Sequence, residues 1–195
     1  SGTCSINNNG QIVGGAPNSF GYTRACLYDS TGGGNNTDLG TLGGLSWSVA
    51  FSINDNGQIV GSAQNGFGYQ HACLFDPTGN GANIDLGTLG GNSYAQSIND
   101  NGQIVGWADN SGMRACLFDP TGLSNNIDLN TLINPASGWI LTQASEINNN
   151  GWIVGQGINP DGQTHAFLLV IPEPATIILL TLGGLVLRRK EKGNF

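Results

Sequence analysis

One ten-residue phrase recurs four times in this chain, and it constrains the fold more than any other feature. The phrase "SINDNGQIVG" occupies residues 52–61 and returns unchanged at 97–106, with near copies at 5–14 ("SINNNGQIVG") and 146–155 ("EINNNGWIVG"). The isoleucines in the second position of the copies are 47, 45 and 49 residues apart. A period of this size is typical of β-propeller blades and of solenoids of paired helices. The spacing therefore predicts four related units.

The recurring phrase has the pattern of a β-hairpin and not of a helix. Asn56-Gly57 lies between two short apolar segments, which is the strongest local signal for a hairpin turn. A two-residue type I′ loop would place Ile53 opposite Val60 on one face of the pair. A three-residue loop would shift the register by one residue. The sequence leaves both loops open.

Two other phrases return at matching offsets. One indicates a strand that ends in an Asp turn, and the other a short strand around Asp-Leu-Gly. The copies are "RACLYDSTG" (24–32), "HACLFDPTG" (71–79), "RACLFDPTG" (114–122) and "HAFLLV" (165–170), then "TDLGTLGG" (37–44), "IDLGTLGG" (84–91) and "IDLNTLIN" (127–134). Each unit thus offers about four strands, the number in a propeller blade. We expect an all-β, β-propeller-like fold with three to four blades and an incomplete ring.

These phrases resemble the bacterial HAF repeat, named for the His-Ala-Phe that stands at 165–167. The resemblance covers nearly all of residues 1–170, and Cys replaces Phe in three units. It implies an extracellular repeat protein with a propeller-like fold, and it implies no agreed biochemical activity. The expected repeat domain is 1–171, with units at about 1–36, 37–83, 84–126 and 127–171.

The end of the last unit suggests a strand order. Because that unit stops at "HAFLLV", we expect each unit to run from the Asp-Leu-Gly strand through the Ile-Asn and Gln-Ile-Val strands to the Ala-Cys-Leu strand. In this order the first unit lacks its Asp-Leu-Gly strand. The expectation that follows is an N-terminal truncation, with an open arc of sheets that exposes its edges.

The last 24 residues, 172–195, have a different composition. Pro172-Glu173-Pro174 cannot extend a strand pair and marks a boundary. The uncharged run Ala175–Leu187 has 13 residues. As a helix it would span roughly 20 Å, less than the ~30 Å hydrocarbon core of a bilayer. The cluster Arg188-Arg189-Lys190 follows, and the positive-inside rule keeps such a cluster in the cytoplasm.

This order of a Pro-Glu-Pro motif, a short hydrophobic helix and a basic cluster resembles the PEP-CTERM sorting signal. The resemblance implies a secreted or cell-envelope protein that is held for a time in the inner membrane by its C-terminus. It also implies an exosortase as partner, which would recognise Pro172, Glu173 and Pro174 and remove the tail. The alternative is an ordinary single-pass membrane anchor.

Charge limits the class of partner. Residues 1–171 contain two basic and eleven acidic side chains, and 172–195 carry a net +2, which gives the total of −7. Two scattered arginines cannot neutralise a phosphate backbone, so we expect no nucleic-acid partner.

No residues form a recognisable catalytic set, and we expect no enzyme activity, no cofactor and no metal site. His71 and His165 share one repeat position with Arg24 and Arg114, which cannot act as bases, so a structural role is expected.

Three cysteines share another repeat position, which Phe167 takes in the fourth unit, and this exchange indicates a small buried hydrophobe. These are Cys26, Cys73 and Cys116. A disulfide between Cys4 and Cys26 is a further candidate in an oxidising compartment.

Acidic turns could suggest calcium, but Asp55 and Asp100 are replaced by Asn8 and Asn149 in the other copies. Turn geometry is the favoured explanation.

Aromatic residues offer the best candidates for ligand contact. Trp47 and Tyr94 follow the "LGG" segments at the same position, where packing between units is expected. Variable loops hold the remaining candidates, because a scaffold gathers its variation there and exposed rings can stack on sugars. They are Phe20, Tyr22, Phe67 and Tyr69.

The leading hypothesis is a non-catalytic binding or scaffold protein of the envelope or exopolysaccharide matrix. The alternatives are a polysaccharide-degrading propeller enzyme whose active site lies in further blades, and a purely structural matrix protein.

Overall fold

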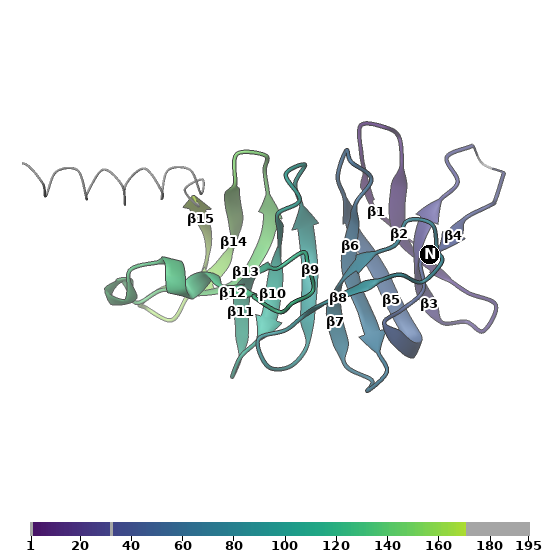
Figure 1. Ribbon diagram of the computed structural model, residues 1–195. Coiled ribbons are helices and arrows are strands. Elements are labelled where there is room, and N and C mark those ends of the chain that lie inside the picture. The colour runs from purple at the N-terminus through teal and green to yellow at the C-terminus, as the bar shows by residue number, and fades with distance from the viewer. Residues whose placement is uncertain (1, 32, 171–195) are drawn as a thin grey trace, which may run out of the picture.

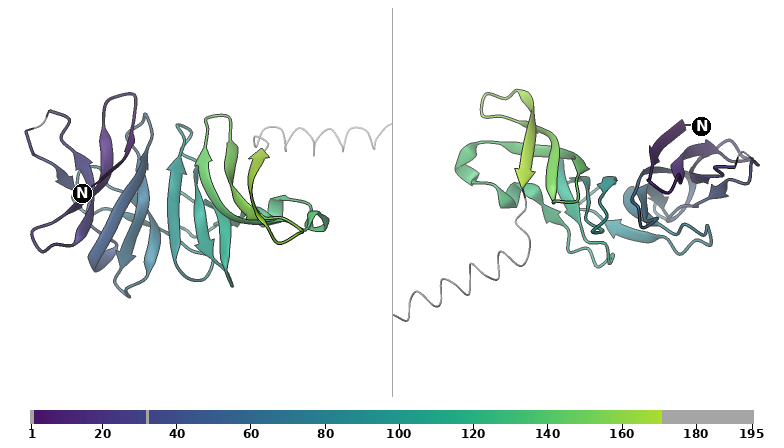
Figure 2. Two further views of the ribbon diagram at one scale, coloured as in Figure 1. Left: turned by 180° about the vertical axis from the view of Figure 1, so that it is seen from behind. Right: turned by 90° about the horizontal axis from the view of Figure 1, so that it is seen from above.

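The computed structural model describes residues 2–31 and 33–170, and this part of the chain is all-β. Four antiparallel sheets follow one another in chain order; the first three have four strands each and the last has three. The sheets lie in a row that curves, with the first and last sheets at opposite ends (Figures 1 and 2).

Each sheet takes its strands from one continuous stretch of chain, and two short 3-10 helices precede the last sheet. The elements are β1 (Gly2–Ile6), β2 (Ile12–Pro17), β3 (Thr23–Tyr28) and β4 (Thr37–Asp38); β5 (Gly43–Ile53), β6 (Ile59–Asn65), β7 (Gln70–Phe75) and β8 (Ile84–Gly87); β9 (Ser93–Ile98), β10 (Ile104–Asp109), β11 (Met113–Phe118) and β12 (Ile127–Asp128); η1 (Leu129–Leu132) and η2 (Pro135–Ser137); β13 (Ile140–Ile147), β14 (Trp152–Ile158) and β15 (Thr164–Val170).

The strand order within a sheet differs from the predicted order. The Asp-Leu-Gly strand closes the preceding sheet instead of opening the next one, with Asp38 paired to Cys26 and Asp85 to Cys73. The reason is that the loop after the Cys strand returns the chain antiparallel along that strand, and consecutive strands usually pair. The first unit was expected to lack this strand. That expectation is wrong, because the first sheet of the described residues contains four strands, β1 to β4. The sheet with three strands is the last.

The repeated hairpin has the three-residue loop, and the type I′ alternative is wrong. Ile53 pairs with Ile59, and the Gly57 N–H donates to the Asn54 carbonyl at 3.0 Å. Only the glycine has a positive φ, +77°, which is the geometry of a type I turn followed by a G1 bulge. The other three copies have the same register.

The core consists of three interfaces between consecutive sheets, and each uses the same residues of the repeat. A Val and an Ala from one sheet cover two isoleucines and a third large apolar residue of the next. The three sets are Val13 and Ala25 on Ile53, Ile59 and Phe75; Val60 and Ala72 on Ile98, Ile104 and Phe118; and Val105 and Ala115 on Ile147, Ile153 and Leu169, which stands where the earlier sheets have Phe. The isoleucines of the recurring phrase thus pack against the preceding sheet, and its valine packs against the following sheet.

The glycine that ends the phrase is required by close packing within the sheet. A Cβ at Gly106 would overlap the carbonyl oxygen of Tyr94 on the neighbouring strand. The same overlap occurs at Gly61 and Gly155. The strands can approach in this way only where no side chain is present.

The cysteine prediction is confirmed for the shared position. Cys73 and Cys116 are fully buried and Cys26 is 4% exposed, and all are free thiols. Cys4 and Cys26 do not pair, because β2 lies between their strands and two strand spacings of about 4.8 Å exceed the usual span of a disulfide.

Candidate binding surfaces

The four repeated hairpins lie at one end of the molecule, the upper end in Figure 1. One asparagine in each joins it to the next hairpin, and we call these residues the asparagine ladder: Asn7, Asn54, Asn99 and Asn148. The side-chain Nδ2 of each of the first three donates to the backbone carbonyl of the next, at 3.0, 2.9 and 2.9 Å. The side-chain Oδ1 of Asn99 also accepts from the backbone N–H groups of Asn101 and Gln103 within its own turn. The ladder therefore fixes each turn and ties neighbouring sheets.

The next residue of each hairpin forms a second line of hydrogen bonds. The Asn8 backbone N–H and Nδ2 donate to the two carboxylate oxygens of Asp55, at 2.9 and 2.7 Å. The Asp55 N–H donates in turn to Asp100, and the Asp100 N–H to Asn149. The hydrogen bonds from Asn8 lower the pKa of Asp55. These carboxylates already accept amide donors, which supports the structural reading over a calcium site.

The aspartates after the Cys strands also act within turns. The Asp76 carboxylate accepts from the Thr78 hydroxyl at 2.6 Å and from the Thr78 backbone N–H at 3.0 Å. The Thr78 hydroxyl, followed by its N–H, is the main cause that lowers the pKa of Asp76. Asp29 and Asp119 repeat this arrangement. Within residues 2–31 and 33–170, no group of three or more His, Cys, Asp or Glu side chains is placed to hold a metal ion.

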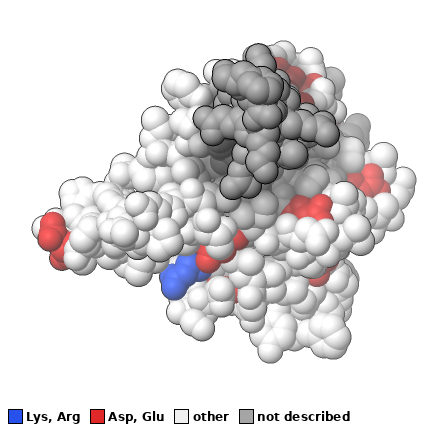
Figure 3. Space-filling view, turned by 60° about the vertical axis from the view of Figure 1, so that its left-hand side comes forward, with Lys and Arg blue, Asp and Glu red and all other residues white. Residues whose placement is uncertain are grey.

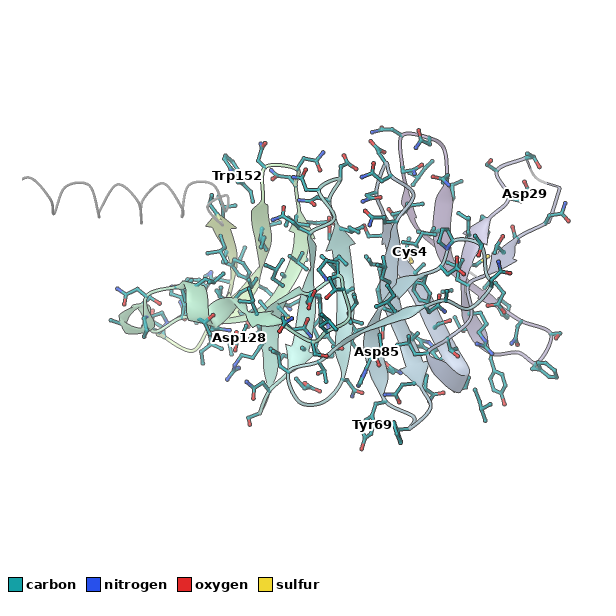
Figure 4. The ribbon with its side chains drawn as sticks, in the orientation of Figure 1. Cys4, Asp29, Tyr69, Asp85, Asp128 and Trp152 are labelled. Atoms are coloured by element: carbon teal, nitrogen blue, oxygen red, sulfur yellow. The ribbon has the colours of Figure 1, made fainter. Side chains whose placement is uncertain are left out.

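The four aromatic residues predicted for ligand contact lie in two equivalent loops at the opposite end of the sheets. Phe20 and Tyr22 belong to the β2–β3 loop and are 82% and 46% exposed, while Phe67 and Tyr69 belong to the β6–β7 loop and are 89% and 58% exposed. Figure 4 shows Tyr69 at this lower end, away from Trp152 in the β13–β14 hairpin. We call this surface the aromatic end.

Both loops are fixed turns. The side-chain Oδ1 of Asn65 accepts from the backbone N–H groups of Phe67 and Tyr69 at 3.0 and 3.1 Å. Asn18 makes the same two bonds in the β2–β3 loop. The exposed rings are therefore held on rigid backbone, which lowers the entropy that a ligand must overcome on binding.

Leu45 extends the apolar surface of the aromatic end. It lies near the start of β5 and is 82% exposed. Arg24, two residues after Tyr22, donates from its guanidinium to the Leu45 carbonyl at 3.3 Å, which links β3 of the first sheet to β5 of the second. The sequence did not single out Leu45, because it lies in a two-residue insertion of the second unit only.

A small cavity lies beside the β2–β3 loop. Its volume is about 180 Å³, and it is lined by residues that include Asn18, Arg24 and Asp38. The Arg24 Nε is buried and has no hydrogen-bond partner among the described residues. Arg24 therefore brings an unpartnered polar donor to the lining of this cavity.

The repeat position that holds His71 or Arg114 pairs with an aspartate on the neighbouring strand. His71 Nδ1 lies 2.9 Å from the Asp85 carboxylate, and Arg114 lies 4.0 Å from Asp128. Burial acts to raise the pKa of Asp85, but the hydrogen bonds from His71 and Gly87, with the charge of His71, outweigh it and lower the pKa. Each pair joins the third and fourth strands of one sheet, as expected for structural residues.

A second aromatic cluster lies between the second and third sheets, and the sequence predicted only part of it. Tyr94 stacks on Trp107 with ring centroids 4.6 Å apart, and Trp47 and Phe51 from the preceding sheet lie 6.2 and 6.3 Å from Tyr94. The expected packing of aromatic residues between units is confirmed. The prediction that Trp47 and Tyr94 occupy the same repeat position is wrong. The pairing aligns Tyr94 with Val49, because Leu45 and Ser46 have no counterpart in the next unit. All four rings are half-buried.

Surface charge is sparse on the face turned forward in Figure 3, where acidic side chains are scattered and basic ones appear in one place. No described helix combines the length and apolar content that a bilayer crossing requires. The predicted sorting motif Pro172-Glu173-Pro174, the apolar run Ala175–Leu187 and the basic cluster Arg188-Arg189-Lys190 lie outside the described residues. Searches against protein-family models, curated proteins and solved structures found no match to this chain.

Proposed function

We propose that this chain is a secreted, non-catalytic repeat protein of the cell envelope or exopolysaccharide matrix that binds polysaccharide through its aromatic end. The observation that carries the proposal is the pair of rigid loops on adjacent sheets, each of which exposes one Phe and one Tyr. Exposed aromatic faces stack on the apolar faces of sugar rings, and Tyr hydroxyls and a nearby Arg can supply hydrogen bonds. A neutral polysaccharide is compatible with an acidic protein.

We further propose that the four sheets are blades of a β-propeller-like array, in line with the resemblance to HAF repeats. Three sheets have four antiparallel strands in chain order, and consecutive sheets pack face to face. These are features of propeller blades. The role of the scaffold would be to hold the aromatic loops of the first two sheets at a fixed separation.

The restriction of aromatic pairs to two of the four loops supports a binding role. The framework of the four units is nearly identical, whereas the equivalent loops of the third and fourth sheets, 109–113 and 159–163, contain no aromatic residue. A residue that served only the framework would be expected in every unit. Exposed apolar residues confined to one part of a repeat indicate an interaction surface.

Affinity electrophoresis of the full chain in gels that contain dextran, hydroxyethylcellulose or extracted exopolysaccharide tests the proposal. A detergent without a sugar headgroup would keep the apolar tail in solution. The double variant Phe67→Ala/Tyr69→Ala should lose about 5- to 150-fold in affinity, since stacking on each of the two rings is worth about 0.5–1.5 kcal/mol. A matched control, Leu123→Ala, changes an exposed residue that lies outside the aromatic end.

Retardation that is equal for the double variant and the control would refute binding through these rings. If no polysaccharide retards the wild-type chain, the structural-matrix alternative is favoured instead. Release of reducing ends or unsaturated sugars from extracted matrix would contradict the non-catalytic reading.

Sorting by the tail is the second part of the proposal, and the resemblance of residues 172–195 to PEP-CTERM signals supports it. Co-expression with an exosortase should shorten the chain by the mass of a C-terminal segment, whereas Pro172→Ala/Glu173→Ala should remain full length. A chain that stays full length and membrane-bound in both cases would favour the simple anchor.

A further inference from the structure

The last sheet exposes the apolar face that each earlier sheet buries against its successor. Val154 occupies the repeat position of Val13, Val60 and Val105, which are fully buried, yet Val154 is 43% exposed. Leu168 corresponds to Leu27, Leu74 and Leu117, which pack against the three core interfaces, and it is 59% exposed. Among the described residues nothing covers this face.

The first sheet exposes the opposite half of the same interface. Ile6 corresponds to Ile53, Ile98 and Ile147, which are 6%, 6% and 7% exposed because the preceding sheet covers them. Ile6 is 64% exposed. The two ends of the row thus display the two halves of an interface that the molecule forms three times internally.

The asparagine ladder ends in complementary hydrogen-bonding groups. At the last hairpin, the donor positions have no partner among the described residues. They are the Asn148 Nδ2, the Asn149 backbone N–H and the Asn150 Nδ2. At the first hairpin, the equivalent acceptors receive nothing from a preceding sheet. They are the Asn7 carbonyl, the Asn8 Oδ1 and the Asn8 carbonyl. In each internal interface these same groups meet, as in the 2.9 Å bond from the Asn99 Nδ2 to the Asn148 carbonyl.

From this match we propose that two copies of the chain associate head to tail, with the first sheet of one copy seated on the last sheet of the other. The occupant is a second copy because both the apolar positions and the hydrogen-bonding groups of each end repeat those of the internal partner. Such an interface is heterologous, so it leaves one free end on each copy and either closes into a ring or continues. This inference does not depend on polysaccharide binding.

Two variants that each block one end give a sharp test. Ile6→Asp places a charge on the first sheet and leaves the last sheet intact, and Leu168→Asp does the reverse. Both positions are well exposed in the single chain, so neither change disturbs its core. Leu123→Asp, on the loop after β11 at 75% exposure, is the matched control. Full-length chains are held in one detergent, so that the apolar tail contributes equally in every sample.

Sedimentation velocity over a concentration series gives the readout. The wild-type chain and the control should form assemblies of two or more copies, and each blocked variant alone should be monomeric. An equimolar mixture of the two blocked variants should form a one-to-one dimer, because one intact first sheet then meets one intact last sheet. Circular dichroism should confirm that each variant keeps its β structure.

Three results would overturn the proposal. The wild-type chain could be monomeric at every concentration. Either blocked variant could assemble like the wild type, which would indicate contact between identical ends or association through the tail. The mixture could stay monomeric while the wild type assembles, which would show that the two ends do not fit each other.

Discussion

Replacing Asn99 by alanine should destabilise the protein strongly, because this one side chain serves two sheets. Asn99 is 3% exposed and makes four hydrogen bonds. Its Nδ2 donates to the Gln103 side chain at 2.7 Å and to the Asn148 carbonyl at 2.9 Å. Its Oδ1 accepts from the N–H groups of Asn101 and Gln103 at 3.1 and 2.9 Å. A net value of about 1 kcal/mol for each of the four bonds gives a loss of about 4 kcal/mol.

Asn148→Ala is the matched comparison. Asn148 holds its own turn through bonds to Asn150 and Trp152, but its Nδ2 has no partner among the described residues, and the side chain is exposed. Loss of these two bonds should cost about 2 kcal/mol. Urea unfolding monitored by circular dichroism measures both values. For a chain of this size a difference of about 2 kcal/mol corresponds to roughly 4–8 °C in Tm. Equal losses for the two variants would refute the idea that the ladder couples neighbouring sheets.

Three further predictions concern single residues of the framework. Gly106→Ala should cost at least about 3 kcal/mol in unfolding experiments, because the new methyl group would overlap the Tyr94 carbonyl. A maleimide should label Cys4 in the native chain and leave Cys116 unmodified, because burial, followed by the charge of a nearby aspartate, raises the pKa of the Cys116 thiol to about 12. Asp85 has a lowered pKa in the folded state, so its ionised form stabilises the fold above the ordinary Asp pKa of about 3.9, and this contribution is lost as the pH falls through the folded pKa. Asp85→Asn should therefore show a weaker loss of stability below about pH 4 than the wild type.

Each of these predictions has its own control. Gly66→Ala, where an added methyl group meets only one atom, at 4.0 Å, should be neutral within about 0.5 kcal/mol, and a similar result for Gly106→Ala would contradict the packing argument. Labelling of all four cysteines should occur in denaturant, and native labelling at more than one site would show that the cysteine positions open readily. Parallel pH curves for wild type and Asp85→Asn would show that the pair with His71 contributes nothing to stability.

The sequence predicted the local features of this fold well, because those features depend on residues close together in the chain. The hairpin at Asn56-Gly57 follows from a turn that needs positive φ, and one of its two permitted registers is observed. The burial of Cys73 follows from its exchange with Phe in another unit. The alternation of apolar residues predicted strands, and all the described elements except two short 3-10 helices are strands.

What the sequence did not predict depends on contacts between units about 45 residues apart. The pairing of Asp38 with Cys26 shifted the boundary of every sheet by one strand, and the order of repeated phrases fits either arrangement equally well. The stack of Trp47, Tyr94 and Trp107 joins three positions that are not equivalent in the repeat. Leu45 lies in an insertion, and a comparison of repeated phrases gives no information about inserted residues. These features required the packing of one sheet on another.

The exchange of Asp and Asn next to the ladder illustrates why a repeat can vary without losing its function. At this position each hairpin must present an oxygen that accepts the backbone N–H of the preceding hairpin, as Asp55 does for Asn8 and Asp100 for Asp55. Either a carboxylate or an amide oxygen meets this need, so both residue types serve. An asparagine adds an Nδ2 donor, and Asn8 and Asn149 each direct theirs to a neighbouring aspartate at 2.7 Å. The asparagines at the two ends therefore supply donors to the two carboxylates between them, and this offsets the repulsion that two adjacent aspartates would otherwise cause.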